Sequence, residues 1–112
     1  MAGPLPDEAV VCRGGTCTAQ RFREGSGVSI GGDGRLGGIS VNASAQVDLK
    51  VLSTSIPNRE LGVTTVGAIR IAGGDVISSP SSRNPYHCVM SGLTSEAAQI
   101  LFTPVQPNPN ME

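Results

Sequence analysis

Aromatic residues are scarce in this sequence, with no tryptophan, one tyrosine and two phenylalanines among 112 residues. Any hydrophobic core must therefore be built mainly from Val, Ile, Leu and Ala. A chain of this length forms one small domain and can bury such a core. The fifteen glycines and eight prolines are scattered between short apolar runs, so the composition predicts a turn-rich folded domain rather than a disordered chain.

The chain also lacks a surplus of basic residues: its formal net charge is −1 and its pI is about 5.7. Nucleic-acid-binding proteins usually carry such a surplus, because contacts with phosphates supply much of their affinity. A local basic cluster stays open as an alternative, since Arg13, Arg21 and Arg23 lie close together in the sequence.

No apolar run is long enough to span a membrane, and the N-terminal residues lack the basic and apolar segments of a signal peptide. The three cysteines cannot all pair within the chain, whereas small secreted domains more often carry an even number. We therefore expect a soluble, cytoplasmic protein with free thiols and no membrane partner, and secretion by a dedicated system stays open.

Several enzyme motifs are missing. The sequence has no P-loop, no G-x-S-x-G segment, no Rossmann fingerprint and no carboxylate pair with the spacing of a glycosidase. Cys12, Cys17, His87 and Cys88 are chemically a zinc set, but adjacent strand residues such as His87 and Cys88 point to opposite faces. The sequence therefore predicts no metal site.

Short strands and short helices are expected to alternate. Thr18, Thr94 and either Thr64 or Thr65 stand where a threonine can cap a helix. The segment GVSIGGDGRLGGISV predicts a hairpin, with GGDG as its turn. The predicted strands otherwise cover residues 8–12, 61–63, 75–78 and 86–90, and the predicted helices cover residues 19–24, 47–52, 67–72 and 95–102.

These elements predict an α+β fold, in which a mixed or mainly antiparallel sheet of short strands is combined with three to four short helices. In the hairpin, residues 28–30 form one arm and residues 39–41 the other. Proline and asparagine alternate near the C-terminus, where we expect irregular structure. The predicted organisation is a flexible N-terminus (1–6), one domain (7–104) and a flexible tail (105–112).

His87 is the first candidate for chemistry. It is the only histidine, it lies in the strand-like segment YHCVM, and an imidazole can act as acid or base near neutral pH. The alternative is a strand histidine that hydrogen-bonds a backbone carbonyl.

Two further candidates are anion sites. In VVCRGG, Arg13 follows a strand, and Gly14 and Gly15 would let backbone N–H groups approach a phosphate or carboxylate. In GVTTVGAIR, Thr64 and Thr65 would offer hydroxyls at the start of a helix. The alternatives are an ordinary turn with a solvated arginine, and plain helix capping.

The segments VVCRGGTC, GVTTVGAIR followed by GGDVI, and NPYHCVMSGLTSEAAQILFTP together resemble a group of short bacterial proteins. They are also similar to the C-terminal toxin domains of polymorphic secretion toxins, a resemblance that covers roughly residues 7–104. Such domains are commonly metal-independent RNases or ADP-ribosyltransferases. A toxin of this kind implies a cognate inhibitor protein as a partner.

For an RNase, the resemblance implies that His87 takes the proton from a 2′-hydroxyl while Arg13 and Thr64 or Thr65 stabilise the phosphorane. No cofactor is then needed. For an ADP-ribosyltransferase, it implies that Arg13 binds the phosphates of NAD and that GGISVNAS supplies Ser40, although Glu60 and Glu96 are poor matches to the expected acid.

Three hypotheses follow. We favour a small toxin-like RNase that uses His87, Arg13 and Thr65 as catalytic residues, with Gly14, Gly15 and Thr64 binding the anion. Its ligand would be RNA or a nucleotide. The alternatives are an NAD-binding ADP-ribosyltransferase-like domain and a non-enzymatic protein-binding domain.

Overall fold

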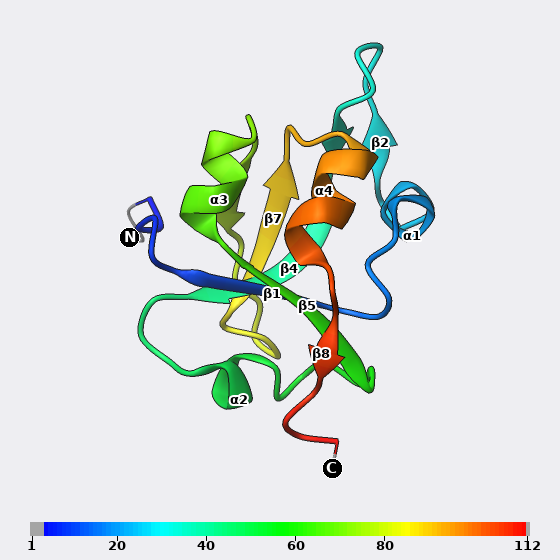
Figure 1. The fold of residues 1–112 in the computed structure, drawn as a ribbon. Coiled ribbons are helices and arrows are strands. Elements are labelled where there is room, and N and C mark those ends of the chain that lie inside the picture. Colours follow the sequence, from blue (N-terminus) through cyan, green and yellow to red (C-terminus); the bar gives the residue numbers. More distant parts are fainter. Residues whose placement is uncertain (1–3, 112) are drawn as a thin grey trace.

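A computed structural model describes residues 4–111 of the chain (Figure 1). Within that range it contains eight strands and four helices. Their bounds, in chain order, are β1 (Val10–Gly14), α1 (Ala19–Arg23), β2 (Ser29–Ile30), β3 (Leu36–Gly37), β4 (Ile39–Ser44), α2 (Leu49–Leu52), β5 (Glu60–Thr65), α3 (Val66–Ile71), β6 (Asp75–Ser78), β7 (His87–Ser91), α4 (Ser95–Phe102) and β8 (Gln106–Pro107).

Six strands of the described chain form one sheet in the order β6-β7-β4-β1-β5-β8, and each neighbouring pair is antiparallel. The remaining two strands, β2 and β3, form a separate hairpin that projects from the top right of Figure 1. The predicted α+β fold with a mainly antiparallel sheet and three to four short helices is therefore confirmed. The first strand lies between β4 and β5, so the residues at its end are surrounded by other elements.

Threonine side chains begin three of the helices, as predicted. Thr18 and Thr94 each accept a hydrogen bond from the N–H three residues further on, at 3.3 and 3.2 Å. Of the two candidates before α3, Thr65 is the cap, because its hydroxyl accepts the N–H of Ala68 at 3.2 Å. Each of these threonines has an extended backbone, so a local side-chain bond sets where each helix starts.

The predicted hairpin is correct in its first arm and wrong in its second. Ile30 pairs with Leu36 across the GGDG turn. The predicted partner strand instead belongs to β4 in the main sheet, where Ile39 pairs with Met90 and Val41 pairs with Cys88. The hairpin is shorter than expected because Ile39, Val41 and Ala43 are buried in β4, which pairs with β1 and β7.

The irregular structure predicted near the C-terminus is wrong at residues 106–107, which form β8. Gln106 and Pro107 pair with β5, and Asn108 is only 1% exposed. Its amide nitrogen donates to the carbonyls of Ile56 and Asn58, at 3.1 and 2.9 Å. Pro107 is tolerated in a strand because β8 lies at the edge of the sheet.

Two smaller differences concern the N-terminal region. The first strand spans Val10–Gly14 rather than residues 8–12, so Arg13 lies inside it. Of the predicted flexible segment 1–6, residues 1–3 lie outside the described residues, and Leu5 packs against the core.

The main core lies between one face of the sheet and the helices α1, α3 and α4. Phe22 of α1 and Phe102 of α4 are fully buried there, with their ring centroids 5.4 Å apart. On the other face of the sheet, α2 packs against β1 and β4, and Leu52 is fully buried. The two phenylalanines thus lie in a core that is otherwise mainly aliphatic.

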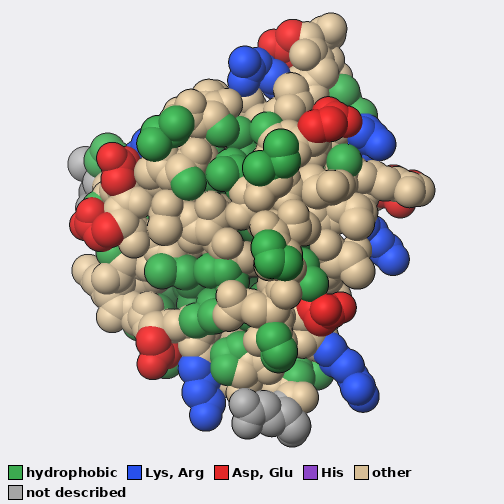
Figure 2. Space-filling model, in the orientation of Figure 1, with side chains coloured by type: hydrophobic (Ala, Val, Ile, Leu, Met, Phe, Trp, Pro, Cys, Tyr) green, Lys and Arg blue, Asp and Glu red, His purple; other side chains and the backbone are tan. Residues whose placement is uncertain are grey.

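Figure 2 shows hydrophobic side chains gathered over the α3 and α4 region of one face. Ile71 of α3 and Ile100 of α4 are 90% and 74% exposed. Lys and Arg side chains lie towards the edges of that view, away from this hydrophobic area.

Candidate functional site

Arg13 lies where the central part of the sheet opens. The pairing of β1 with β4 ends at Cys12 and Asn42, although both strands continue beyond that point. The Arg13 guanidinium fills this position, donating a 2.6 Å hydrogen bond to the carbonyl of Ser40 and lying 5.3 Å from the centre of the Phe22 ring. Strand β4 and helix α1 therefore fix the arginine from two directions.

His87 begins β7, and both of its ring nitrogens have partners. Nδ1 lies 2.8 Å from the carbonyl oxygen of Ser79, which can only accept, so Nδ1 carries a proton. In the neutral ring Nε2 is then an acceptor, and the Ser40 hydroxyl at 3.2 Å donates to it. A backbone carbonyl thus orients the imidazole, and the imidazole in turn orients a serine.

Arg13, Ser40 and His87 come from three neighbouring strands, β1, β4 and β7. Ser40 joins them, because its carbonyl accepts from Arg13 and its hydroxyl contacts His87. The structure therefore brings together two of the predicted catalytic residues and adds the serine named in the ADP-ribosyltransferase hypothesis.

Thr64 and Thr65 do not join this group. In the β1–β5 pairing Arg13 lies opposite Gly62, whereas Thr65 lies opposite Val10 at the other end of β1. Three residues of strand separate Gly62 from Thr65 by about 10 Å. Thr65 also uses its hydroxyl to cap α3, so the structure does not bring Thr64 and Thr65 together with Arg13.

Gly14 and Gly15 lie beside Arg13, but their contribution differs from the predicted one. The N–H of Gly15 donates to the carbonyl of Glu60 at 2.9 Å, so it is already used within the protein. A Cβ on Gly14 would stand 2.2 Å from Oδ1 of Asn58 and 2.6 Å from Cγ2 of Ile56. Gly14 is therefore needed because the 56–58 loop lies directly on β1.

Two hollows meet at Arg13. The first has a volume of about 440 Å³ and extends towards α1, where Arg21, Glu24 and Thr16 line it together with Arg59. The second has a volume of about 340 Å³ and extends towards β4 and β7. Both hollows are lined by Arg13, Gly14 and Asn58.

The two hollows differ in charge. The first is lined by three arginines and by the carboxylates Glu24 and Glu60. Apart from Arg13 and His87, the polar side chains that line the second hollow are neutral, and they are Ser40, Asn42, Ser55, Asn58 and Asn84.

Arg13 is a half-buried cation, and no carboxylate oxygen of residues 4–111 lies within 4 Å of it in an ion pair. Burial lowers the pKa of its guanidinium, an effect that the neighbouring Cys17 partly offsets. An arginine remains charged in spite of such a shift. The position therefore favours an anion that would replace the lost water.

The three cysteines are buried and unpaired in the structure. Burial raises the pKa of Cys12 to about 12, with a smaller contribution from Cys17, and burial also raises the pKa of Cys17 and Cys88. These thiols are therefore protonated at neutral pH and pack as small apolar side chains. In the part of the chain that the structure describes, no three His, Cys, Asp or Glu side chains are grouped to hold a metal ion.

Sequence reasoning missed the asparagines of the site. Asn42 is 6% exposed; its amide donates to the Leu52 carbonyl at 2.9 Å and its oxygen accepts from Asn84 at 2.9 Å. Asn58 reaches the site because Asn108 holds its loop. These contacts join residues 10 to 50 positions apart, so no local pattern could have indicated them.

No protein-family model, curated protein sequence or solved structure matches this chain. None of the helices within residues 4–111 is both long and apolar enough to cross a membrane. The conclusions about function therefore depend on the geometry around Arg13, Ser40 and His87.

Proposed function

We propose that the two hollows at Arg13 bind NAD and that the domain acts as an ADP-ribosyltransferase-like enzyme. The observation that carries this proposal is the hydrogen bond between Arg13 and Ser40, the two residues that this hypothesis requires together. The RNase hypothesis also required Thr64 or Thr65, which lie at the other end of β1.

The residues present fit the parts of NAD. Guanidinium groups are well suited to phosphate oxygens, and Arg13, Arg21 and Arg59 line the first hollow. The second hollow offers neutral amides and hydroxyls, which suit the ribose and base of a nucleotide. We assign the pyrophosphate to Arg13 at the junction and a nucleoside half to the second hollow.

NAD would be the substrate that supplies ADP-ribose, with nicotinamide as the leaving group. In such a transfer the bond between the ribose carbon and nicotinamide breaks, and nicotinamide keeps the electron pair. The acceptor atom bonds to that carbon and gives up a proton. His87 Nε2 can take this proton, since Ser79 holds the other nitrogen as a donor. Glu96 of α4 is not available for this role, because it pairs with Arg23 of α1.

Calorimetry with NAD tests the proposal. The wild-type protein is expected to bind saturably, and Arg13→Gln is expected to weaken binding by about tenfold or more, because a charged hydrogen-bond donor to phosphate is lost. Lys50→Gln is the matched control: it also removes one positive charge, and Lys50 lines neither hollow. Absence of heat with NAD, or equal affinity in Arg13→Gln, would contradict the proposal.

A metal-independent RNase is the second candidate, because the Ser40 hydroxyl and Arg13 lie beside His87, where a phosphodiester could bind. On this hypothesis the purified protein cleaves RNA in the presence of EDTA. His87→Ala should then abolish cleavage without lowering the melting temperature. If the protein leaves RNA intact, the RNase hypothesis is excluded.

A further inference from the structure

The arginines of this protein fall into two groups. Among residues 4–111, three of the seven form ion pairs: Arg23 with Glu96, Arg35 with Asp33, and Arg70 with Asp7 and Asp75. The other four are outside every ion pair in that range, and they are Arg13, Arg21, Arg59 and Arg83.

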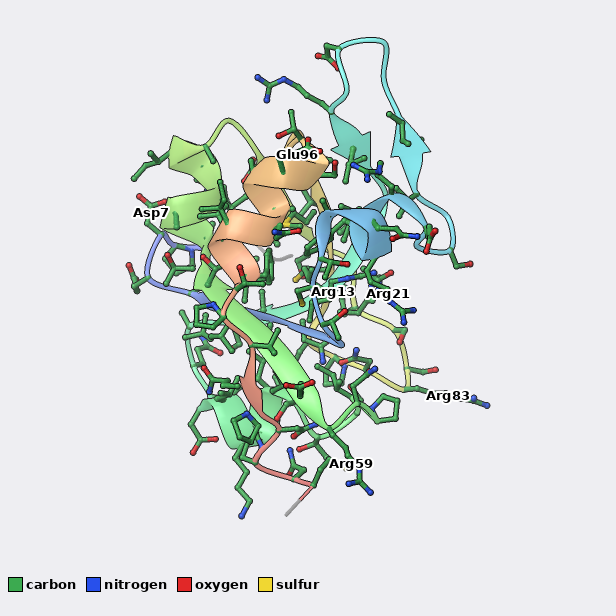
Figure 3. The ribbon with its side chains drawn as sticks, turned by 45° about the vertical axis from the view of Figure 1, so that its right-hand side comes forward. Asp7, Arg13, Arg21, Arg59, Arg83 and Glu96 are labelled. Atoms are coloured by element: carbon green, nitrogen blue, oxygen red, sulfur yellow. The ribbon has the colours of Figure 1, made fainter. Side chains whose placement is uncertain are left out.

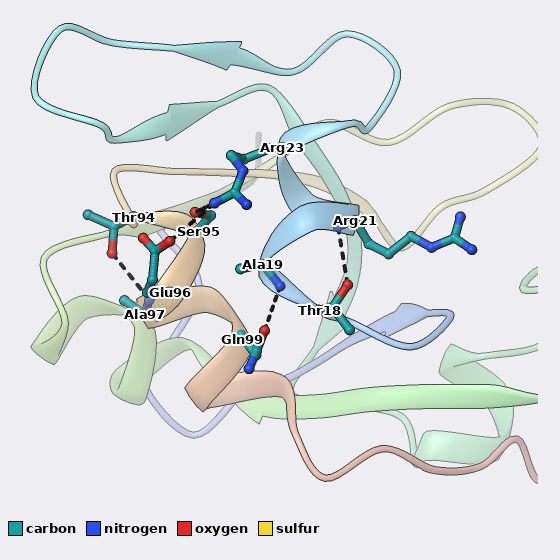
Figure 4. A network of polar contacts seen from close by, with 9 residues as sticks. All are labelled: Thr18, Ala19, Arg21, Arg23, Thr94, Ser95, Glu96, Ala97 and Gln99. Carbon is teal, nitrogen blue, oxygen red and sulfur yellow. Dashed lines mark hydrogen bonds and ion pairs between the residues drawn. The ribbon is translucent and has the colours of Figure 1, made fainter.

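The four arginines outside ion pairs share one side of the molecule. Figure 3 shows Arg21, Arg59 and Arg83 towards the right and Arg13 near the middle, whereas Asp7 lies on the left. Figure 4 shows the distinction within one helix: Arg23 points to Ser95 and Glu96 of α4, at 2.6 and 3.1 Å, while Arg21 points away from them. These four arginines outnumber the carboxylates Glu24 and Glu60 that line the first hollow, although the net charge of the whole chain is −1.

A third hollow extends the site beyond His87. Its volume is about 260 Å³, and Arg83, Pro85 and Tyr86 are among the residues that line it. It shares Ser55 and Asn84 with the second hollow. Since the second hollow shares Arg13 with the first, the three hollows are neighbours along the surface, and we call them the track.

The two ends of this track have different chemistry. The first hollow provides Arg21 and Arg59, which are solvent-exposed. The third hollow provides an aromatic ring, Tyr86, beside Arg83. Asn84 holds this end in place, because its oxygen accepts the N–H of Tyr86 at 3.1 Å and its amide donates to Asn42 at 2.9 Å.

We propose that this track binds a single strand of nucleic acid, with phosphates on the exposed arginines and a base against Tyr86. Cationic side chains along a groove, combined with an aromatic ring, are the means by which proteins hold single strands. An acidic peptide would use the arginines but would leave the aromatic hollow without a planar partner. This inference goes beyond the proposed function, because the strand would occupy the first two hollows in place of NAD.

Fluorescence anisotropy with labelled oligonucleotides of about eight residues tests the proposal without NAD. One probe is oligo(U) RNA and the other is oligo(dT) DNA, so the test shows whether the protein binds RNA or DNA. We expect at least one to bind. We expect Tyr86→Ala to weaken binding about tenfold and Tyr86→Phe to keep it, because stacking needs the ring. Arg83→Gln should lower the slope of log affinity against log salt concentration by the contribution of about one phosphate contact.

Lys50→Gln is again the charge-matched control, and it should bind as the wild type does. Failure of both probes, or equally tight binding of poly-glutamate, would overturn the proposal. If the Tyr86→Ala variant does not fold, the Arg83→Gln and Tyr86→Phe variants are used for the test instead. Tyr86→Ala should leave NAD affinity unchanged in calorimetry. Loss of strand binding therefore overturns this inference alone, and absence of NAD binding overturns the proposed function alone.

Discussion

Arginine is paired with a carboxylate at the α1–α4 contact but unpaired in the track of hollows. At the contact, Arg23 is held by Ser95 and Glu96, and the N–H of Ala19 donates to Gln99 at 2.7 Å (Figure 4). In the track, Arg21 lies only two residues from Arg23 and has no carboxylate partner within the described chain. Paired charges connect elements of the fold, whereas unpaired cations in a hollow are available to a ligand.

The same contrast holds for Arg70 and Arg13. Arg70 lies 2.6 Å from Asp7 and 3.1 Å from Asp75, and its hydrogen bonds to these carboxylates raise the pKa of its guanidinium. Burial instead lowers the pKa of Arg13, whose nearest recorded acceptor is a backbone carbonyl. The charge of Arg70 is neutralised within the fold, and that of Arg13 is not.

Phe22→Ala should have the largest effect, because Phe22 belongs to both regions. Its ring packs on Phe102 in the core and supports the Arg13 guanidinium. Truncation should lower the free energy of unfolding by about 3–5 kcal/mol, measured by urea denaturation. Ile71→Ala is the control, because Ile71 is 90% exposed and should change stability little. A loss below about 1 kcal/mol for Phe22→Ala would contradict the packing described here.

Acid should weaken the fold by protonating the carboxylates that pair with arginines. The pKa of Asp75 is lowered by the N–H of Val76 and then by Arg70; that of Glu96 is lowered by its own backbone N–H and by Ser95, with a smaller contribution from Arg23. These carboxylates stabilise the fold above their unfolded pKa values, about 3.9 for Asp and 4.3 for Glu. The stabilisation is lost as the pH falls through the lower folded values.

The melting temperature should therefore be level above about pH 5 and fall as the pH drops below about 4. Asp75→Asn should make the fall shallower, and Lys50→Gln should leave its slope unchanged. An equally steep fall in Asp75→Asn would show that this carboxylate is not a source of the acid sensitivity.

The smallest effect is expected from the matched pair Arg21→Gln and Arg23→Gln. Arg23→Gln should lower the free energy of unfolding by at most about 1 kcal/mol, since the side chains of Arg23 and Glu96 are 43% and 71% exposed. Arg21→Gln should leave stability unchanged and should weaken NAD binding instead. The reverse pattern would show that the two arginines have been assigned to the wrong regions.

Local signals in the sequence were sufficient to predict where the helices lie. The threonine caps at Thr18, Thr65 and Thr94 depend on contacts three residues away, and strand β6 follows from a short apolar segment bounded by turns. The α+β class followed from the order of these elements.

The site needed contacts that the sequence does not display. Arg13 meets Ser40 across 27 positions, and Asn108 holds Asn58 across 50. Strand β8 was missed for the same reason, because Asn108 beside it bonds to the distant 56–58 loop. Thr64 and Thr65 looked like ligand groups because the register of β5 against β1 could not be known in advance.

A crystal structure with bound NAD would test the central claim most directly. The account predicts pyrophosphate oxygens within hydrogen-bonding distance of the Arg13 guanidinium, and a nucleoside half in the second hollow beside Ser40 and His87. NAD bound away from Arg13, or empty hollows at saturating NAD, would contradict it.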